Sequence, residues 1–146
     1  MDFNLVFNTS MFTLYLRLLC FAFRIHLTIK GIFMGDQVID EDALLGMKSL
    51  LGEQFNDTLD FCYCEFDRLN QELAQSIHND NESAIRHVHS LKSNAAQFGA
   101  LTLAAMAKKV EHSLNDGNLN DALVYAAQLQ SLIDQTKDKI NLWKGK

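Results

Sequence analysis

The sequence contains no proline, and its seven glycines are scattered through 146 residues, so little in it interrupts a helix. Its three cysteines are an odd number, which does not suit a disulfide framework and favours a reducing compartment. Cys62 and Cys64 have one residue between them, whereas redox and zinc motifs use two. The net charge of -5 comes without a basic stripe and argues against nucleic acid as a partner. These absences favour a helical protein of the cell interior without metal or nucleic-acid chemistry.

The composition changes near Met34, and residues 1–33 differ from the rest of the chain. They hold six of the ten phenylalanines and a single acidic residue, whereas the sequence from Met34 onward holds 17 acidic and 10 basic residues. Arg17 and Arg24 interrupt the apolar segment, so it offers no uncharged run of about 18 residues for a membrane span, and no clean signal peptide. Three interpretations remain: a membrane-associating helix, an additional packing helix, or sequence upstream of a true start at Met34. We favour the third, because ordinary soluble composition begins there.

From Met34 onward the apolar residues recur at spacings of three and four, which predicts helices. A short helix begins near a capping Asp40 and breaks at Gly52. Four longer helices are predicted over residues 55–77, 84–98, 103–114 and 118–143. Their short connections predict an all-α fold, an antiparallel up-down four-helix bundle with the short N-terminal helix covering one end. The bundle would form one domain over residues 36–143, and it would be a monomer because its apolar stripes are used inside it.

One histidine of the predicted helix over residues 84–98 stands outside the apolar stripe. On a wheel of about 100° per residue, His89 lies about 140° from the centre of the stripe, so it should face solvent. Lys92 and Ser93 follow one turn later and share its surface. His87 lies about 60° to the other side of the centre, at the edge of a neighbouring helix. An exposed histidine is usually a plain solvated side chain, so any further role for His89 depends on the residues around it.

The surroundings of His89 are small and apolar. Ile85 and Ala96 are expected to turn outward beside the histidine. Ser93 and Ala96 are small enough to let another protein approach closely. Together with Lys92, these residues are the candidates for contact with a partner protein.

The residues from His89 to Gly99 form a pattern. A histidine, any residue, a leucine, a lysine and a small residue precede a small apolar stretch that ends in an aromatic residue and a glycine. About two turns into the next helix, Val110 and Glu111 form an apolar–glutamate pair. This arrangement resembles histidine-containing phosphotransfer (HPt) domains, the relay modules of bacterial two-component signalling, in their free-standing form, although the small position is serine here and glycine in many members. The likeness covers residues 36–143, and Gly99 should let the chain turn in a left-handed conformation.

The resemblance implies a phosphocarrier rather than an enzyme. A neutral imidazole is a competent nucleophile near neutral pH. By the resemblance, Nε2 of His89 accepts a phosphoryl group from a phospho-aspartate in the receiver domain of a hybrid histidine kinase and passes it to the aspartate of a response regulator. Lys92 would hold the phosphate oxygens, and Ser93 would give close access. Mg²⁺ would bind in the receiver, so no cofactor, no metal and no ATP-dependent kinase activity are expected of this chain, which should act in the cytoplasm.

Two other interpretations stay open. A bundle of the same fold could bind receivers or kinases without being phosphorylated, although such an adaptor needs neither His89 nor Lys92. A membrane-tethered adaptor would use residues 1–33 as its anchor, which fractionation of cells would reveal. Lys108 and Lys109 could touch an acidic receiver rim, but a solvated pair is the simpler interpretation.

Overall fold

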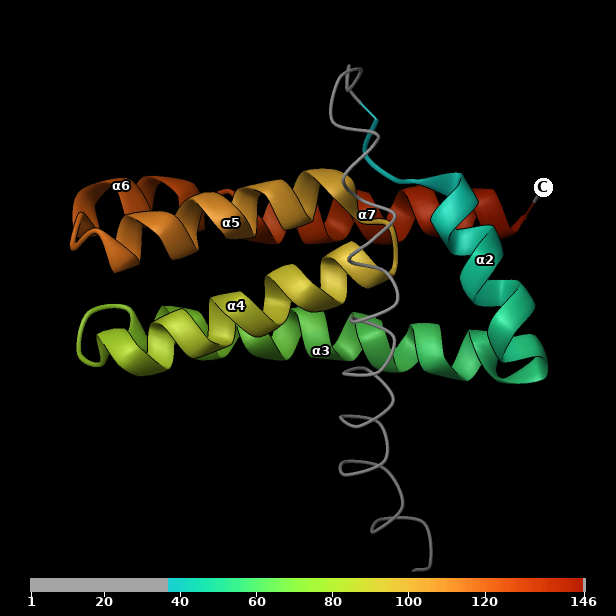
Figure 1. The fold of residues 1–146 in the computed structure, drawn as a ribbon, viewed down its shortest axis with the longest axis horizontal. Coiled ribbons are helices and arrows are strands. Elements are labelled where there is room, and N and C mark those ends of the chain that lie inside the picture. The colour runs from blue at the N-terminus through green and yellow to red at the C-terminus, as the bar shows by residue number, and fades with distance from the viewer. Residues whose placement is uncertain (1–36, 146) are drawn as a thin grey trace, which may run out of the picture. The chain divides into compact units, whose positions relative to one another are not determined.

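The computed structural model describes residues 37–145, and this part of the chain contains helices and short connections but no strand. The helices form a four-helix bundle whose last member is divided into two helices, with a short additional helix before the bundle, which confirms the predicted all-α fold (Figure 1). The elements are α2 (Glu41–Leu51), the 3-10 turn η1 (Gly52–Gln54), α3 (Phe55–Ser76), α4 (Asn81–Gln97), α5 (Leu101–Asn115), α6 (Leu119–Ala126) and α7 (Leu129–Lys144). None of these helices combines the length and the apolar content that a membrane span requires. The expectations for residues 1–33, including a start at Met34, lie outside the described residues.

Neighbouring helices of the bundle run in alternating directions (Figure 1). α4 packs against both α3 and α5, α5 packs against α6 and α7, and α7 returns to α3. The centre is filled by side chains from the predicted stripes, which are fully buried: Leu59, Phe66, Leu73, Val88, Leu91, Leu103, Val110, Leu114, Leu129, Ile133 and Ile140. Cys62 lies in the same core as a free thiol, one turn before Phe66 on the buried face of α3. Burial of these apolar faces is therefore the main force that aligns the helices.

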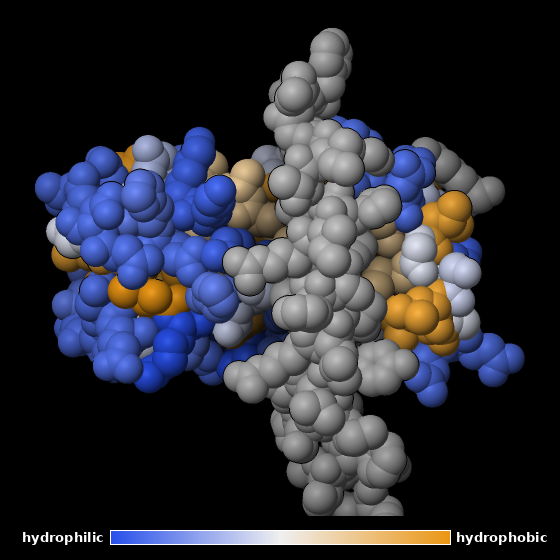
Figure 2. All heavy atoms as spheres, in the orientation of Figure 1, coloured by the Kyte–Doolittle hydropathy of each residue, from blue (hydrophilic) through white to orange (hydrophobic). Residues whose placement is uncertain are grey.

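The short helix α2 covers one end of the bundle, as predicted. Its buried residues are Leu44 and Met47, which join the common core. At the same end the rings of Phe55 and Trp143 meet edge to face, with centroids 6.1 Å apart. Leu45, on the other side of α2, is 60% exposed, and hydrophobic atoms gather at this end of the molecule (Figure 2).

A close contact joins the start of α2 to the end of α4. The Asp40 side chain caps α2 by accepting a hydrogen bond from Ala43 N at 3.1 Å. The backbone N–H of Asp40 donates to the carbonyl oxygen of Gly99 at 2.7 Å. Gly99 has φ +65°, and a Cβ atom at this position would lie 2.8 Å from the Asp40 carbonyl oxygen. Both the left-handed conformation and the available space therefore require glycine here, which confirms its structural role.

The prediction of one continuous helix over residues 118–143 is wrong. The structure has two helices there, α6 and α7, with a turn at Ala127 and Gln128. Gln128 N bonds the carbonyl of Tyr125 at 3.1 Å, three residues back rather than four. The apolar spacing runs on through this turn and no proline or glycine stands at it, so periodicity could not reveal the break.

Candidate functional site

α4 presents His89 on the side away from the bundle core. The helix is capped by Asp80, whose side chain accepts a hydrogen bond from Ser83 N at 3.0 Å. Its core residues Val88 and Leu91 are fully buried. The side chain of His89 is 60% exposed, which confirms the position expected from the helix wheel. Packing thus holds the helix from one side and leaves an accessible imidazole on the other.

A carboxylate from α5 connects this histidine to a lysine. Nδ1 of His89 lies 2.5 Å from Oε1 of Glu111, and Nζ of Lys92 pairs with Oε2 of the same carboxylate. His89 and Lys92 are one turn apart on α4, so both reach the single partner on α5. The Glu111 side chain is 14% exposed and lies between the two helices. We call these three side chains the His89–Lys92–Glu111 cluster.

The Glu111 carboxyl group stays ionised in this setting. Partial burial raises its pKa, but the hydrogen bonds and positive charges of Lys92 and His89 lower it, and the net shift of the pKa is downward. An ionised carboxylate only accepts hydrogen bonds, so Nδ1 of His89 carries the proton and donates it. In the neutral imidazole the lone pair then resides on Nε2. On an exposed ring this nitrogen is accessible to a reactant.

Lys92 is more enclosed than the helix wheel suggested. Its side chain is only 28% exposed because it turns toward Glu111 on α5. Ser93 is partly buried, and its hydroxyl donates to the backbone carbonyl of His89 at 3.0 Å. The hydroxyl of Ser93 is therefore satisfied within α4, and its small side chain occupies little space beside His89.

Ile85 and Ala96 turn outward only in part. Both are half-buried, and Ile85 packs against the core. On the wheel both lie within about 40° of Lys92, whose side chain reaches across to α5. The neighbouring helix covers this side of α4, and a wheel drawn for one helix cannot show that.

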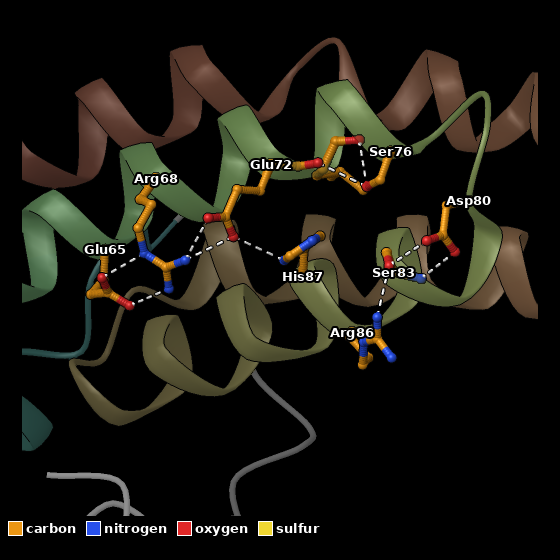
Figure 3. A network of polar contacts seen from close by, with 9 residues as sticks. Glu65, Arg68, Glu72, Ser76, Asp80, Ser83, Arg86 and His87 are labelled. Carbon is orange, nitrogen blue, oxygen red and sulfur yellow. Dashed lines mark hydrogen bonds and ion pairs between the residues drawn. The ribbon is translucent and has the colours of Figure 1, made fainter. Parts of the chain in front are cut away.

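His87 faces α3 and belongs to a different set of contacts (Figure 3). Its Nδ1 lies 3.1 Å from Oε2 of Glu72. Arg68 donates to the same glutamate at 2.7 Å and to Glu65 at 2.7 Å. These side chains form a polar seam between α3 and α4, which we call the His87–Glu72–Arg68 seam. The structure therefore separates the two histidines, as the sequence predicted.

The remaining histidines of the described part show no comparable surroundings. Residues 37–145 contain no group of three or more His, Cys, Asp or Glu side chains that could hold a metal ion. His78 is exposed, and Nε2 of the exposed His112 lies 3.4 Å from Asp116, one turn further on α5.

Glu111 is the site residue to which the sequence assigned no role. The apolar–glutamate pair at Val110 and Glu111 was the available signal, since one residue of such a pair faces the core and the next lies beside it. Val110 is indeed fully buried. Which side chain the glutamate reaches depends on how α4 and α5 pack, and the sequence does not give that packing.

Comparison with known proteins finds a family model and solved structures with a similar fold. The family model described as Hpt domain matches residues 57–139, which is more than half of the chain. Histidine-containing phosphotransfer protein B (HptB) from Pseudomonas aeruginosa PAO1 is 18% identical and superposes with a TM-score of 0.70, over 76% of this chain and 97% of its own. ZmHP2 from maize, a histidine-containing phosphotransfer protein, is 19% identical with a TM-score of 0.63, over 87% of this chain and 93% of its own. At this identity the likeness shows a shared fold. Among curated proteins no match is found.

Proposed function

Because the chain belongs to the Hpt domain family, we propose that it carries a phosphoryl group on Nε2 of His89 in a multistep phosphorelay. Membership of the family gives a phosphotransfer role in two-component signalling, that of a phosphocarrier rather than a kinase. The donor in this proposal is the phospho-aspartate of a receiver domain in a hybrid histidine kinase, and the acceptor is the aspartate of a response regulator. The observation that carries the proposal is the contact of Glu111 with Nδ1, because it leaves Nε2 as the outward nucleophile.

The transfer is a displacement at phosphorus. The lone pair of Nε2 forms an N–P bond while the P–O bond to the donor aspartate breaks, and the electrons of that bond return to the donor carboxylate. The imidazole becomes cationic as the N–P bond forms, and the Glu111 carboxylate on Nδ1 stabilises that charge. Attack by the acceptor carboxylate breaks the N–P bond and restores the neutral ring.

In this proposal Lys92 holds the phosphoryl oxygens. Its ammonium group has three hydrogens, so it can keep its contact with Glu111 and still donate to a phosphate oxygen. Ser93, one residue further along α4, leaves room for the approach of a receiver. In this proposal the partner contacts a surface around these residues that includes the half-buried Ile85 and Ala96.

The partner supplies the remaining chemistry in this proposal. Carboxylates of the receiver hold the Mg²⁺ ion that balances the phosphoryl charge, and this chain uses no cofactor of its own. We place the protein in the cytoplasm, where hybrid kinases expose their receivers, and we propose that it acts as a monomer. The burial of the apolar stripes of α3, α4 and α5 inside the bundle supports the monomer.

Transfer from a phosphorylated receiver tests the proposal. A receiver domain labelled by an autophosphorylating hybrid kinase is mixed with the wild-type chain, with His89→Ala and with His87→Ala as the matched control. The proposal predicts acid-labile, base-stable label on the wild type and on His87→Ala, and none on His89→Ala. Equal labelling of all three proteins would show that His89 is not the acceptor. A wild type that binds the receiver without acquiring label would favour the adaptor instead.

A further inference from the structure

Positive charge gathers on the helix pair that carries the cluster. Residues 81–115, which contain α4 and α5, hold four lysine or arginine side chains and two carboxylates. The other described residues, 37–80 and 116–145, hold five such cations and 14 carboxylates. The helix pair therefore has a net charge of +2, and the remainder of the described chain has -9. An asymmetry of this kind orients a charged protein as it approaches.

Three of the four cations on the helix pair have partners within the domain. Arg86 pairs at 3.2 Å with a glutamate one turn earlier on α4. Lys92 pairs with Glu111, and Nζ of Lys109 lies 5.6 Å from the centre of a tyrosine ring on α6. Lys108 is exposed and makes no hydrogen bond or ion pair with the described residues. Its charge is therefore available to another molecule.

Lys108 lies at the rim of the His89–Lys92–Glu111 cluster. It precedes Glu111 by three positions on α5, and residues three apart on a helix are neighbours with about 5–6 Å between Cβ atoms. On the wheel of α5, Lys108 lies about 60° from Glu111 on the solvent side, and the buried Val110 lies on the other side. A protein that bound over the exposed ring of His89 would therefore contact the ammonium group of Lys108 at the edge of the interface.

We infer that Lys108 is a docking residue for an acidic protein surface, the rim of the partner's phosphorylation pocket. The inference rests on the proposed function. A pocket that holds Mg²⁺ beside a phosphorylated aspartate is built from carboxylates, so its rim is negative. Lys108 attracts this rim while the acidic remainder of the domain repels it, so the encounter is directed to the face formed by α4 and α5. Lys108 contributes to the rate and selectivity of docking, whereas phosphoryl transfer itself takes place at the His89–Lys92–Glu111 cluster.

A charge reversal with a matched control tests this assignment. Lys108→Glu is compared with Lys139→Glu, which makes the same change of net charge at an exposed position on α7. The probe is a receiver domain phosphorylated with acetyl phosphate and Mg²⁺, selected from a panel as the one that labels the wild-type chain fastest. Lys108→Glu should slow transfer about fivefold to tenfold at low salt, and Lys139→Glu should change it less than twofold. A higher salt concentration should lower the transfer rate of the wild type and reduce the difference in rate between the wild type and Lys108→Glu.

A reaction without a partner separates docking from chemistry. Potassium phosphoramidate phosphorylates an accessible imidazole directly, and both variants should accept phosphate from it at the wild-type rate. Slower labelling of Lys108→Glu by phosphoramidate would make Lys108 part of the phosphate site and overturn the docking role.

Three outcomes of the receiver experiment would also overturn an inference. Equal effects of the two charge reversals on receiver transfer, or no effect of either, would overturn the docking role of Lys108. A Lys108-dependent attachment to anionic lipid vesicles with unchanged receiver transfer would assign the face to a membrane instead. No label on wild-type His89 from any receiver would overturn the proposed function itself, and this inference with it.

Discussion

Two histidines of α4, two residues apart, have similar partners and different surroundings. Nδ1 of His87 lies 3.1 Å from a glutamate of α3, and Nδ1 of His89 lies 2.5 Å from a glutamate of α5. Each glutamate also binds a cation, Arg68 in the first case and Lys92 in the second. The side chain of His87 is 27% exposed and that of His89 is 60% exposed. A carboxylate that orients a histidine is therefore not sufficient to identify that histidine as a phosphorylation site.

The position of the cation distinguishes the two arrangements. Arg68 belongs to α3, the helix of its own glutamate, and it binds both Glu65 and Glu72 along that helix. Lys92 lies on the helix of the histidine, one turn from it, so a group bound to His89 would be within its reach. The seam thus holds two helices together, whereas the cluster leaves an accessible nitrogen beside a cation.

Removing each glutamate gives the largest expected contrast. Glu111→Ala should slow phosphoryl transfer to His89 roughly 10- to 100-fold, because the ring loses the partner that fixes its tautomer and orientation. Glu72→Ala should leave transfer within about twofold of the wild type and lower the free energy of unfolding by no more than about 1 kcal/mol, since its contacts are partly exposed. Single-turnover labelling and urea unfolding measure the two effects. The comparison fails if both variants slow transfer equally.

Removing each cation should give a smaller contrast. Lys92→Ala should slow transfer on the order of tenfold, since a hydrogen bond to a charged group contributes about 1.5 kcal/mol. The bundle should stay folded, because its core contains no part of this side chain. Arg68→Ala is the control on the other side of α4, and its transfer rate should match the wild type. Transfer that is insensitive to Lys92→Ala would remove this lysine from the phosphate site.

The titration of Glu111 should give the smallest effect. Its pKa in the folded protein is lowered by Lys92 and His89 against the effect of burial. A lowered folded pKa means that the ionised carboxylate stabilises the fold above the ordinary glutamate pKa of about 4.3 and that this contribution is lost as the pH falls through the folded value. The difference in unfolding free energy between the wild type and Glu111→Gln should therefore shrink on acidification. In carboxyl NMR the Glu111 midpoint should lie below the ordinary value and rise in Lys92→Ala, and a midpoint at or above the ordinary value would contradict the pairing.

Helix ends marked by a capping residue or a glycine were predictable from the sequence, whereas the unmarked turn between α6 and α7 and the contacts between helices were not. Asp40, Gly52 and Gly99 act on their own helix ends, so local chemistry identified the caps and breaks correctly. The wheel placed His89 and His87 on opposite sides because each position depends on one helix alone. The enclosure of Lys92 and Ile85 depends on α5 as well, and there the wheel failed.

The imidazole nitrogen that carries the phosphoryl group shows whether Glu111 determines the site of reaction. The wild-type chain is labelled by a phosphorylated receiver, and heteronuclear NMR identifies the imidazole nitrogen that is bonded to phosphorus. Because Glu111 holds the proton on Nδ1, we expect phosphorylation of His89 at Nε2 alone. Phosphorus on Nδ1 of His89, or on His87, would contradict it.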